Sequence, residues 1–123
     1  MAVTYTTAVK NARLDAVVTA IGATGVLEIG TTSMASVLAT IALNSTAGTT
    51  SGGVLTFSGF PKSDSSADAT GTAAAARIRT ASGGTDIVTG LTVGTSGSDI
   101  NLTSTSITSG QTVTISSATI THA

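Results

Sequence analysis

The sequence predicts a single, mainly β domain: an antiparallel β-sandwich or jelly-roll-like fold with one short N-terminal helix. Apolar residues recur with helical spacing only near the N-terminus, and from Gly25 onward they alternate with a period of two. Clusters of Gly, Ser, Asn and Asp separate the alternating runs at short intervals, as in β-sandwiches. A parallel sheet would need helical crossovers that the chain lacks. We therefore treat residues 1–123 as one β domain.

The helix is expected over residues 5–21. Its apolar residues have the i, i+3, i+4, i+7 spacing of one helical stripe: Leu14, Val17, Val18 and Ile21. Thr6 or Thr7 can cap the first turn, and Gly22 suits the left-handed residue that follows a helix. We expect the stripe to pack on one end or face of the β domain.

Short strands are expected from about residue 25 to residue 121. The alternating runs are 25–29, 37–43, 54–57, 75–80, 86–93, 100–103, 112–115 and 118–122. In the run 86–93, alternation places Ile87, Thr89, Leu91 and Val93 on one face.

The connections are marked by glycine and polar residues. We expect hairpins at 82–86, 95–99 and 108–112, where Gly supplies the positive φ of a tight turn. The segments 44–53 and 61–72 are rich in small polar residues, and we expect both to be exposed loops.

The tail, residues 97–123, is rich in Ser and Thr. Its expected inward residues are Ile100, Leu102, Ile107, Val113, Ile115 and Ile120. Threonine suits the outward face of a strand. It can also be buried against a partner without the desolvation cost of Lys or Glu. The tail therefore predicts strands whose outer face another protein could cover.

Charge is scarce in this chain. Charged residues make up 9% of it, against about 25% in typical soluble domains. The net charge of −1 provides no basic field for nucleic acid or an anionic membrane. Low charge promotes association. Lysine and proline often protect the edge strands of soluble β proteins from pairing with another chain, but this chain has only Lys10, Lys62 and Pro61. Either loops cover the edges or another chain, such as a second copy, completes them.

Catalytic parts are few. The chain has no cysteine, which excludes thiol catalysis, and His122 is its only histidine, which excludes the usual zinc sites. Asp64 and Asp68 share one loop that could hold calcium, but it lacks the glycine and bidentate Glu of a known calcium loop, so we interpret them as solvated turn residues. We expect no enzymatic activity, no cofactor and no small-molecule substrate.

Arg77 and Arg79 lie on one face of the expected strand 75–80. They could clamp an anionic partner, or they could form ion pairs across strands or between subunits, which is the interpretation we favour. The N-terminus has no secretory signal pattern, and no apolar run reaches the length of a membrane span.

Four stretches carry a resemblance: "MAVTYTTAVKNARLDAVVTAIGATGVLEIGT" at the start, then "GGVLTF", "DATGTAAAARIR" and "INLTSTSITSGQTVTISSATIT". In their composition and in their order along most of the chain, they resemble small proteins encoded among the virion structural genes of tailed bacteriophages and prophages. Such gene clusters include capsid decoration proteins, also called cement proteins. The resemblance supplies no catalytic motif and no functional residue.

The resemblance implies a decoration protein that staples neighbouring major coat subunits on the capsid surface, made in the bacterial host cytoplasm. Its partners would be the major capsid protein and copies of itself. A tail, tail-tip or head–tail connector component is the first alternative. A host-attachment or glycan-binding β domain is the second, against which the scarcity of aromatic residues weighs. Interface contacts are expected at the chain ends and the arginine pair: Val3, Tyr5, Arg77, Arg79, Ile120 and His122.

Overall fold

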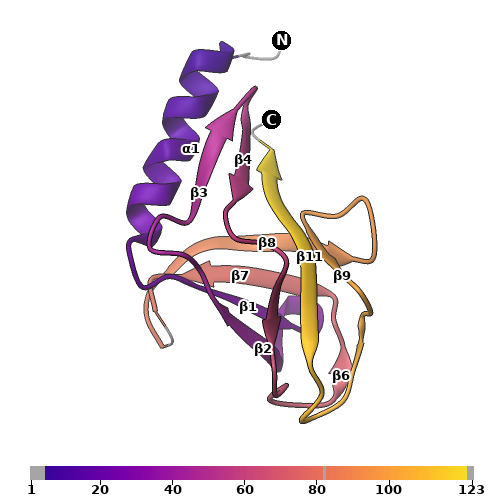
Figure 1. The fold of residues 1–123 in the computed structure, drawn as a ribbon. Coiled ribbons are helices and arrows are strands. Elements are labelled where there is room, and N and C mark those ends of the chain that lie inside the picture. The colour runs from indigo at the N-terminus through magenta and orange to yellow at the C-terminus, as the bar shows by residue number, and fades with distance from the viewer. Residues whose placement is uncertain (1–4, 82, 122–123) are drawn as a thin grey trace.

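The protein is mainly β with one helix at the N-terminus, as predicted, and its strands form a curled sheet that is mixed rather than purely antiparallel (Figure 1). The computed structural model describes residues 5–81 and 83–121. The elements are α1 (Thr7–Ile21), β1 (Val26–Gly30), η1 (Thr32–Met34), β2 (Val37–Ala42), β3 (Gly48–Ser51), β4 (Val54–Phe57), β5 (Lys62–Asp64), β6 (Gly71–Thr72), β7 (Ala75–Arg79), β8 (Asp86–Gly94), β9 (Ile100–Leu102), β10 (Ser106–Ile107) and β11 (Val113–Thr121). The architecture is β-sandwich-like.

Helix α1 forms as its sequence predicts. The side chain of Thr6 accepts a hydrogen bond from the backbone N–H of Val9 (3.4 Å), and Gly22 ends the helix with φ of 74°. Leu14 and Ile21 of the stripe are buried in the core, and Val17 and Val18 pack against it. The rest of the core is Ile, Leu, Val and Ala with one buried aromatic, Phe57. The helix therefore covers one end of the sheet.

The strands follow the order β2-β1-β7-β8-β9-β11-β4-β3, with β5 also paired to β11 and a separate small pair of β6 and β10. The segment 82–86 joins antiparallel β7 and β8, as expected, although Ser82 lies outside the described residues. The predicted hairpin at 95–99 is wrong, because β8 and β9 pair in parallel through Val93 with Ile100. This one parallel pair makes the sheet mixed.

The parallel pair depends on side chains in the connection 95–99. The carboxylate of Asp99 accepts hydrogen bonds from the N–H and hydroxyl of Thr92 (3.0 and 3.1 Å). The side-chain oxygen of Asn101 accepts one from the N–H of Ser98 (3.1 Å). These bonds fold the connection back on itself, so the chain re-enters the sheet in its original direction.

The predicted hairpin at 108–112 is also wrong. A turn is present, with the N–H of Gln111 donating to the carbonyl of Thr108 (2.9 Å). However, Ile107 pairs with Gly71 of β6, and Val113 pairs with Asp64 of β5. The turn therefore connects strands in different parts of the fold.

The segments expected to be loops contain strands. β3 lies in 44–53, and β5 and β6 lie in 61–72. β3 pairs with β4 across a two-residue turn at Gly52 and Gly53. Their φ angles are 60° and 78°, and a two-residue hairpin turn of type I′ requires positive φ at both positions. The two expected strands 112–115 and 118–122 are instead one strand, β11, with a register shift between Ile115 and Ser117.

The predicted face of β8 is also wrong. Leu91 is buried, but Thr89 is exposed. Leu91 lies opposite Ala76 and Val88 lies opposite Ile78, so the register shifts between these pairs. Gly90, with φ of 74°, lies in the shifted segment. An extra residue at such a bulge reverses the alternation of side chains, which period-two counting does not anticipate.

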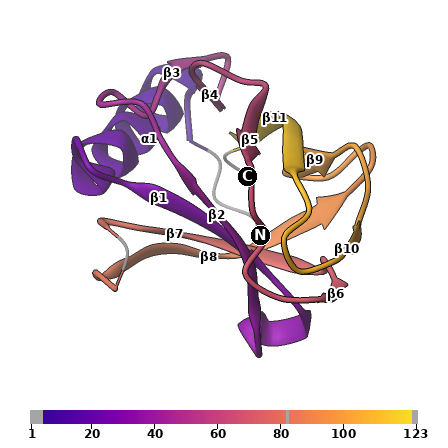
Figure 2. The same cartoon turned by 60° about the horizontal axis from the view of Figure 1, so that its bottom comes forward.

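The curl of the sheet brings β5 back beside β2 (Figure 2). The Asp64 carboxylate accepts a hydrogen bond from the Thr40 N–H (3.0 Å), and the Lys62 ammonium donates to the Asn44 side-chain oxygen (2.7 Å). We call these four residues the β2–β5 seam. Just beyond it, the N–H of Asp68 donates to the carbonyl of Leu38 (2.7 Å). This edge of the sheet is therefore covered by the chain itself, which is the first of the two expected alternatives.

We expect Asp64→Ala to lower the free energy of unfolding by about 1–3 kcal/mol, because the N–H of Thr40 loses its acceptor. Asp68→Ala is the matched control. The Asp68 side chain is exposed and has no hydrogen-bond partner within the described residues, so its removal should change stability by less than about 0.5 kcal/mol. Chemical denaturation of both variants measures the difference, and equal effects would contradict the importance of the seam.

Candidate interaction surface

An array of hydroxyl groups covers one face of β3, β4 and β11. Residues directly opposite each other in neighbouring strands share a face. The strand registers align two rows on this face: Thr49, Thr56 and Thr119, and beside them Ser51, Val54 and Thr121. The array continues toward β9, where the side-chain amide of Asn101 donates to the hydroxyl of Ser117 (3.0 Å). We call these eight residues the hydroxyl face.

The opposite side of the same strands is turned to the helix. There Thr50, Leu55 and Ile120 form a row. Leu55 is fully buried and Ile120 packs against the core. The hydroxyl of Thr50 donates to the carboxylate of Asp15 on α1 (2.8 Å). The hydroxyl face therefore looks away from α1 and from the core.

Burial along the tail confirms its predicted inward and outward faces. The expected inward residues Ile100, Leu102, Ile107, Val113 and Ile115 are buried, and Ile120 is half-buried. The hydroxyl face itself is largely exposed: Thr49, Ser51, Thr56, Ser117 and Thr121 are exposed, while Val54, Asn101 and Thr119 are half-buried. None of its residues carries a charge, so a partner can cover the face without desolvating an ion.

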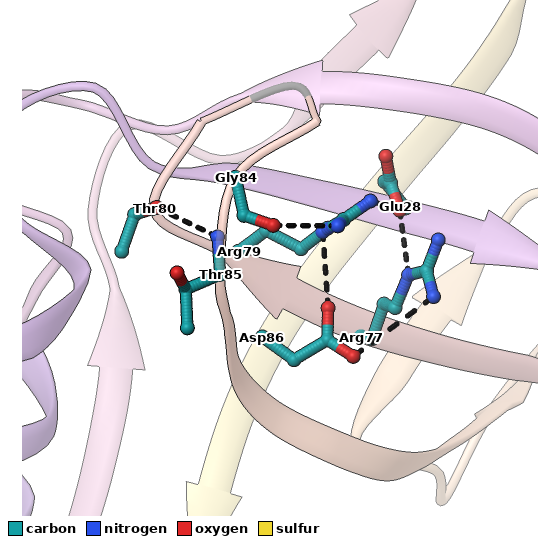
Figure 3. A network of polar contacts seen from close by, with 7 residues as sticks. All are labelled: Glu28, Arg77, Arg79, Thr80, Gly84, Thr85 and Asp86. Atoms are coloured by element: carbon teal, nitrogen blue, oxygen red, sulfur yellow. Dashed lines mark hydrogen bonds and ion pairs between the residues drawn. The ribbon is translucent and has the colours of Figure 1, made fainter.

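The arginine pair belongs to a compact ionic network on β1, β7 and β8 (Figure 3). Glu28, only 5% exposed, is the one charged residue buried among those described. Its carboxylate lies 2.6 Å from Nε of Arg77 and 3.7 Å from Nη1 of Arg79. Glu28 lies opposite Arg77 in the register of β1 and β7. The two guanidinium groups therefore cover a carboxylate that would otherwise be buried without compensation.

Asp86 completes the network. Its oxygens lie 3.0 Å from Nε of Arg79 and 4.0 Å from Nη1 of Arg77. The Nε–H of Arg79 is not aligned with the Asp86 oxygen, so this contact is an ion pair without a hydrogen bond. Arg79 also donates through Nη2 to the carbonyl of Gly84. The network has two cations and two anions, so its net charge is zero. The arginines form ion pairs across strands, which is the interpretation that we favoured from the sequence.

The other predicted interface residues lie in different places. Tyr5 lies just before Thr6, the N-cap of α1, with the guanidinium of Arg13 4.6 Å from its ring centroid. Ile120 lies on the inner side of β11. Val3 and His122 lie outside the described residues. The structure therefore does not bring Tyr5, Ile120 and the arginine pair into one surface.

Asp64 differs from the solvated turn residue we expected, whereas Asp68 agrees with that interpretation. Asp64 accepts hydrogen bonds from the N–H groups of Ser66 and Thr40 (both 3.0 Å), the second across a long stretch of sequence. Asp68 is exposed. Within residues 5–81 and 83–121, no three His, Cys, Asp or Glu side chains gather in a group that could hold a metal ion.

Sequence reasoning missed the half of the hydroxyl face that lies on β3 and β4. Thr49 and Ser51 fall in the segment expected to be a loop, and Thr56 was not assigned to a face. The signal that could have found them is the pair Gly52–Gly53 between two runs with strand propensity.

Comparisons with protein-family models, with curated proteins and with solved structures found no match. The surface of the described residues has no pocket. In the same part of the chain, no helix has the length and apolar character needed to cross a membrane.

We expect Glu28→Gln to lower the free energy of unfolding by about 1.5–3 kcal/mol, because hydrogen bonds to charged groups have this magnitude. The variant keeps the size of the side chain but leaves two guanidinium groups without their buried counter-charge. Asp86→Asn is the control, since this side chain is 43% exposed and should contribute less than about 1 kcal/mol. Urea denaturation of both variants gives the comparison, and a larger effect at Asp86 would contradict this account.

Proposed function

We propose that the protein is a capsid decoration protein of a tailed bacteriophage, which binds neighbouring major coat subunits through the hydroxyl face and staples them. The observation that supports this most is the face itself, which crosses four strands and carries no charged residue. Its residues have short side chains, so they lose little conformational entropy on binding. Each hydroxyl can exchange a hydrogen bond with water for one with the partner.

A stapling protein also needs a rigid contact surface, and the position of β11 supports this. β11 pairs with β9 and β5 along one half and with β4 along the other. The hydroxyl face is therefore fixed to the core of the domain through the strand that carries Thr119 and Thr121. Rigid surfaces lose less freedom on binding than flexible loops.

The engagement of the carboxylates agrees with a structural role. Asp15, Glu28, Asp64, Asp86 and Asp99 each bind another group of the chain in the described structure. In this proposal the protein acts by non-covalent binding on the outer capsid surface. Its partners are the major capsid protein and copies of itself, after synthesis in the bacterial host cytoplasm.

The number of copies of this chain in each purified phage particle tests the proposal. We expect hundreds of copies, because a decoration protein follows the coat lattice. Quantitative mass spectrometry relative to the major coat protein measures the ratio. A handful or tens of copies would contradict decoration and favour a tail or connector component. Absence from the particle would overturn a virion role, and hits in a glycan screen would then favour the glycan-binding alternative.

Thr56→Lys tests the hydroxyl face directly. We expect binding to capsids stripped of this protein to weaken at least about tenfold, or 1.4 kcal/mol, because burying the ammonium has a desolvation cost. Thr108→Lys is the matched control, an exposed threonine in the turn before β11, and should bind like the wild type. Circular dichroism checks that both variants fold. Equal binding by the two variants would exclude the hydroxyl face as the contact.

A further inference from the structure

The side of α1 that faces away from the core carries no charge. The residues on it, all exposed, are Tyr5 just before the helix, then Ala8, Val9, Ala12, Ala16, Thr19 and Ala20. Tyr5 and Val9 are the large hydrophobic residues exposed in the described structure, at 42% and 43%. A helix on the surface of a soluble domain normally places charged and polar residues on this side. We call these seven residues the outer face of α1.

The outer face of α1 is bordered by opposite charges. Successive helix residues are about 100° apart, so Arg13 and Asp15 project to opposite sides of the buried Leu14 between them. Both are exposed. One border of the outer face is therefore positive and the other negative, at nearly the same height along the helix.

We propose that α1 packs through its outer face against α1 of a second copy, with the helices parallel and the two-fold axis along them. This symmetry brings the positive border of each helix against the negative border of the other. Arg13 then lies beside Asp15 of the partner subunit, and the same pair repeats on the other side. An antiparallel arrangement would instead bring like charges together at both borders. Charge complementarity thus selects a second copy in one orientation.

The side chains of the outer face fit such a contact. Ala12 and Ala16 are one helical turn apart and let two helices approach to about 8 Å between their axes. Val9 lies one turn before Ala12 and adds apolar area at the same seam. Arg13 stacks over the ring of Tyr5, and a guanidinium stacked on a ring keeps its N–H edge for a carboxylate. Figures 1 and 2 both show α1 at the margin of the molecule.

This inference does not depend on the proposed function. The hydroxyl face lies on the side of the β3–β4 hairpin that is turned away from α1. A pair of copies joined through α1 therefore leaves two hydroxyl faces uncovered. A monomeric wild-type chain that still decorates capsids would overturn the pairing and leave the proposed function standing.

Sedimentation equilibrium of the full chain, from about 1 µM to 1 mM, tests the pairing. We expect a monomer–dimer equilibrium for the wild type, and for Ala16→Glu a dissociation constant at least about tenfold higher. Glutamate favours helices, so α1 should remain folded, which circular dichroism verifies. Thr108→Glu, an exposed change far from α1 in sequence, is the control and should dimerise like the wild type. A monomeric wild type, an assembly of three or more copies, or equal dimerisation of both variants would overturn the proposal.

A charge exchange tests the orientation. Arg13→Asp and Asp15→Arg should each weaken the dimer, because each places like charges at both borders. The double variant restores opposite charges and should recover a dissociation constant within about threefold of the wild type. Thermal melting confirms that each variant is folded, since Asp15 also binds Thr50. A double variant weaker than either single variant would overturn the parallel arrangement.

Discussion

Closure of the sheet at the β2–β5 seam is the constraint on which the rest of the structure depends. Lys62 and Asp64 lie opposite Ile115 and Val113 in the register of β5 and β11, so their side chains share the face of two buried core residues. Inward-pointing charges are one way in which β proteins prevent unwanted pairing at an edge. Here Asp64 accepts a hydrogen bond from the backbone N–H of Thr40 in β2, a group that a strand ladder could otherwise pair. Lys62 donates to the side-chain oxygen of Asn44, just after β2. The sheet is thereby held curled around its core, although β2 and β5 do not form a ladder.

The few charged side chains of this protein mostly bind one another or other groups of the chain, and two of its surfaces are therefore uncharged. The ionic network around Glu28 uses four of the eleven charged side chains, and the seam uses two more. Because these groups are committed within the chain, the hydroxyl face and the outer face of α1 are left without ions. Uncharged surfaces of this kind have a low desolvation cost when a partner covers them. The ionic groups thus stabilise the fold, and the neutral groups remain for contacts with other molecules.

The sequence predicted those elements that depend on residues close together in the chain. The cap at Thr6, the stripe of α1 and the apolar alternation of strands such as β1 and β7 all follow from neighbouring residues. β5 could not be found in this way, because "KSD" has no apolar alternation and its partner β11 is distant in sequence. β3 also lacks apolar alternation, and only the Gly52–Gly53 turn beside it indicated its pairing with β4. The parallel entry of β9 depends on Asp99 reaching Thr92, a contact that composition does not encode. The tail half of the hydroxyl face was predictable from alternation, whereas its alignment with Thr49 and Thr56 required the register.

In the proposed role, the positions of the two uncharged faces would let a small domain staple a lattice. The β3–β4 hairpin separates them: its inner side contacts α1 through Thr50, and its outer side carries Thr49 and Thr56. A pair of copies joined through α1 would present two hydroxyl faces held at a fixed separation. Once one face binds a coat subunit, the second binds from a high effective concentration, so two weak contacts combine into a strong one if the spacing matches the lattice. Such a divalent arrangement needs no large apolar patch and no pocket, because its affinity comes from two linked contacts whose spacing matches that of the lattice.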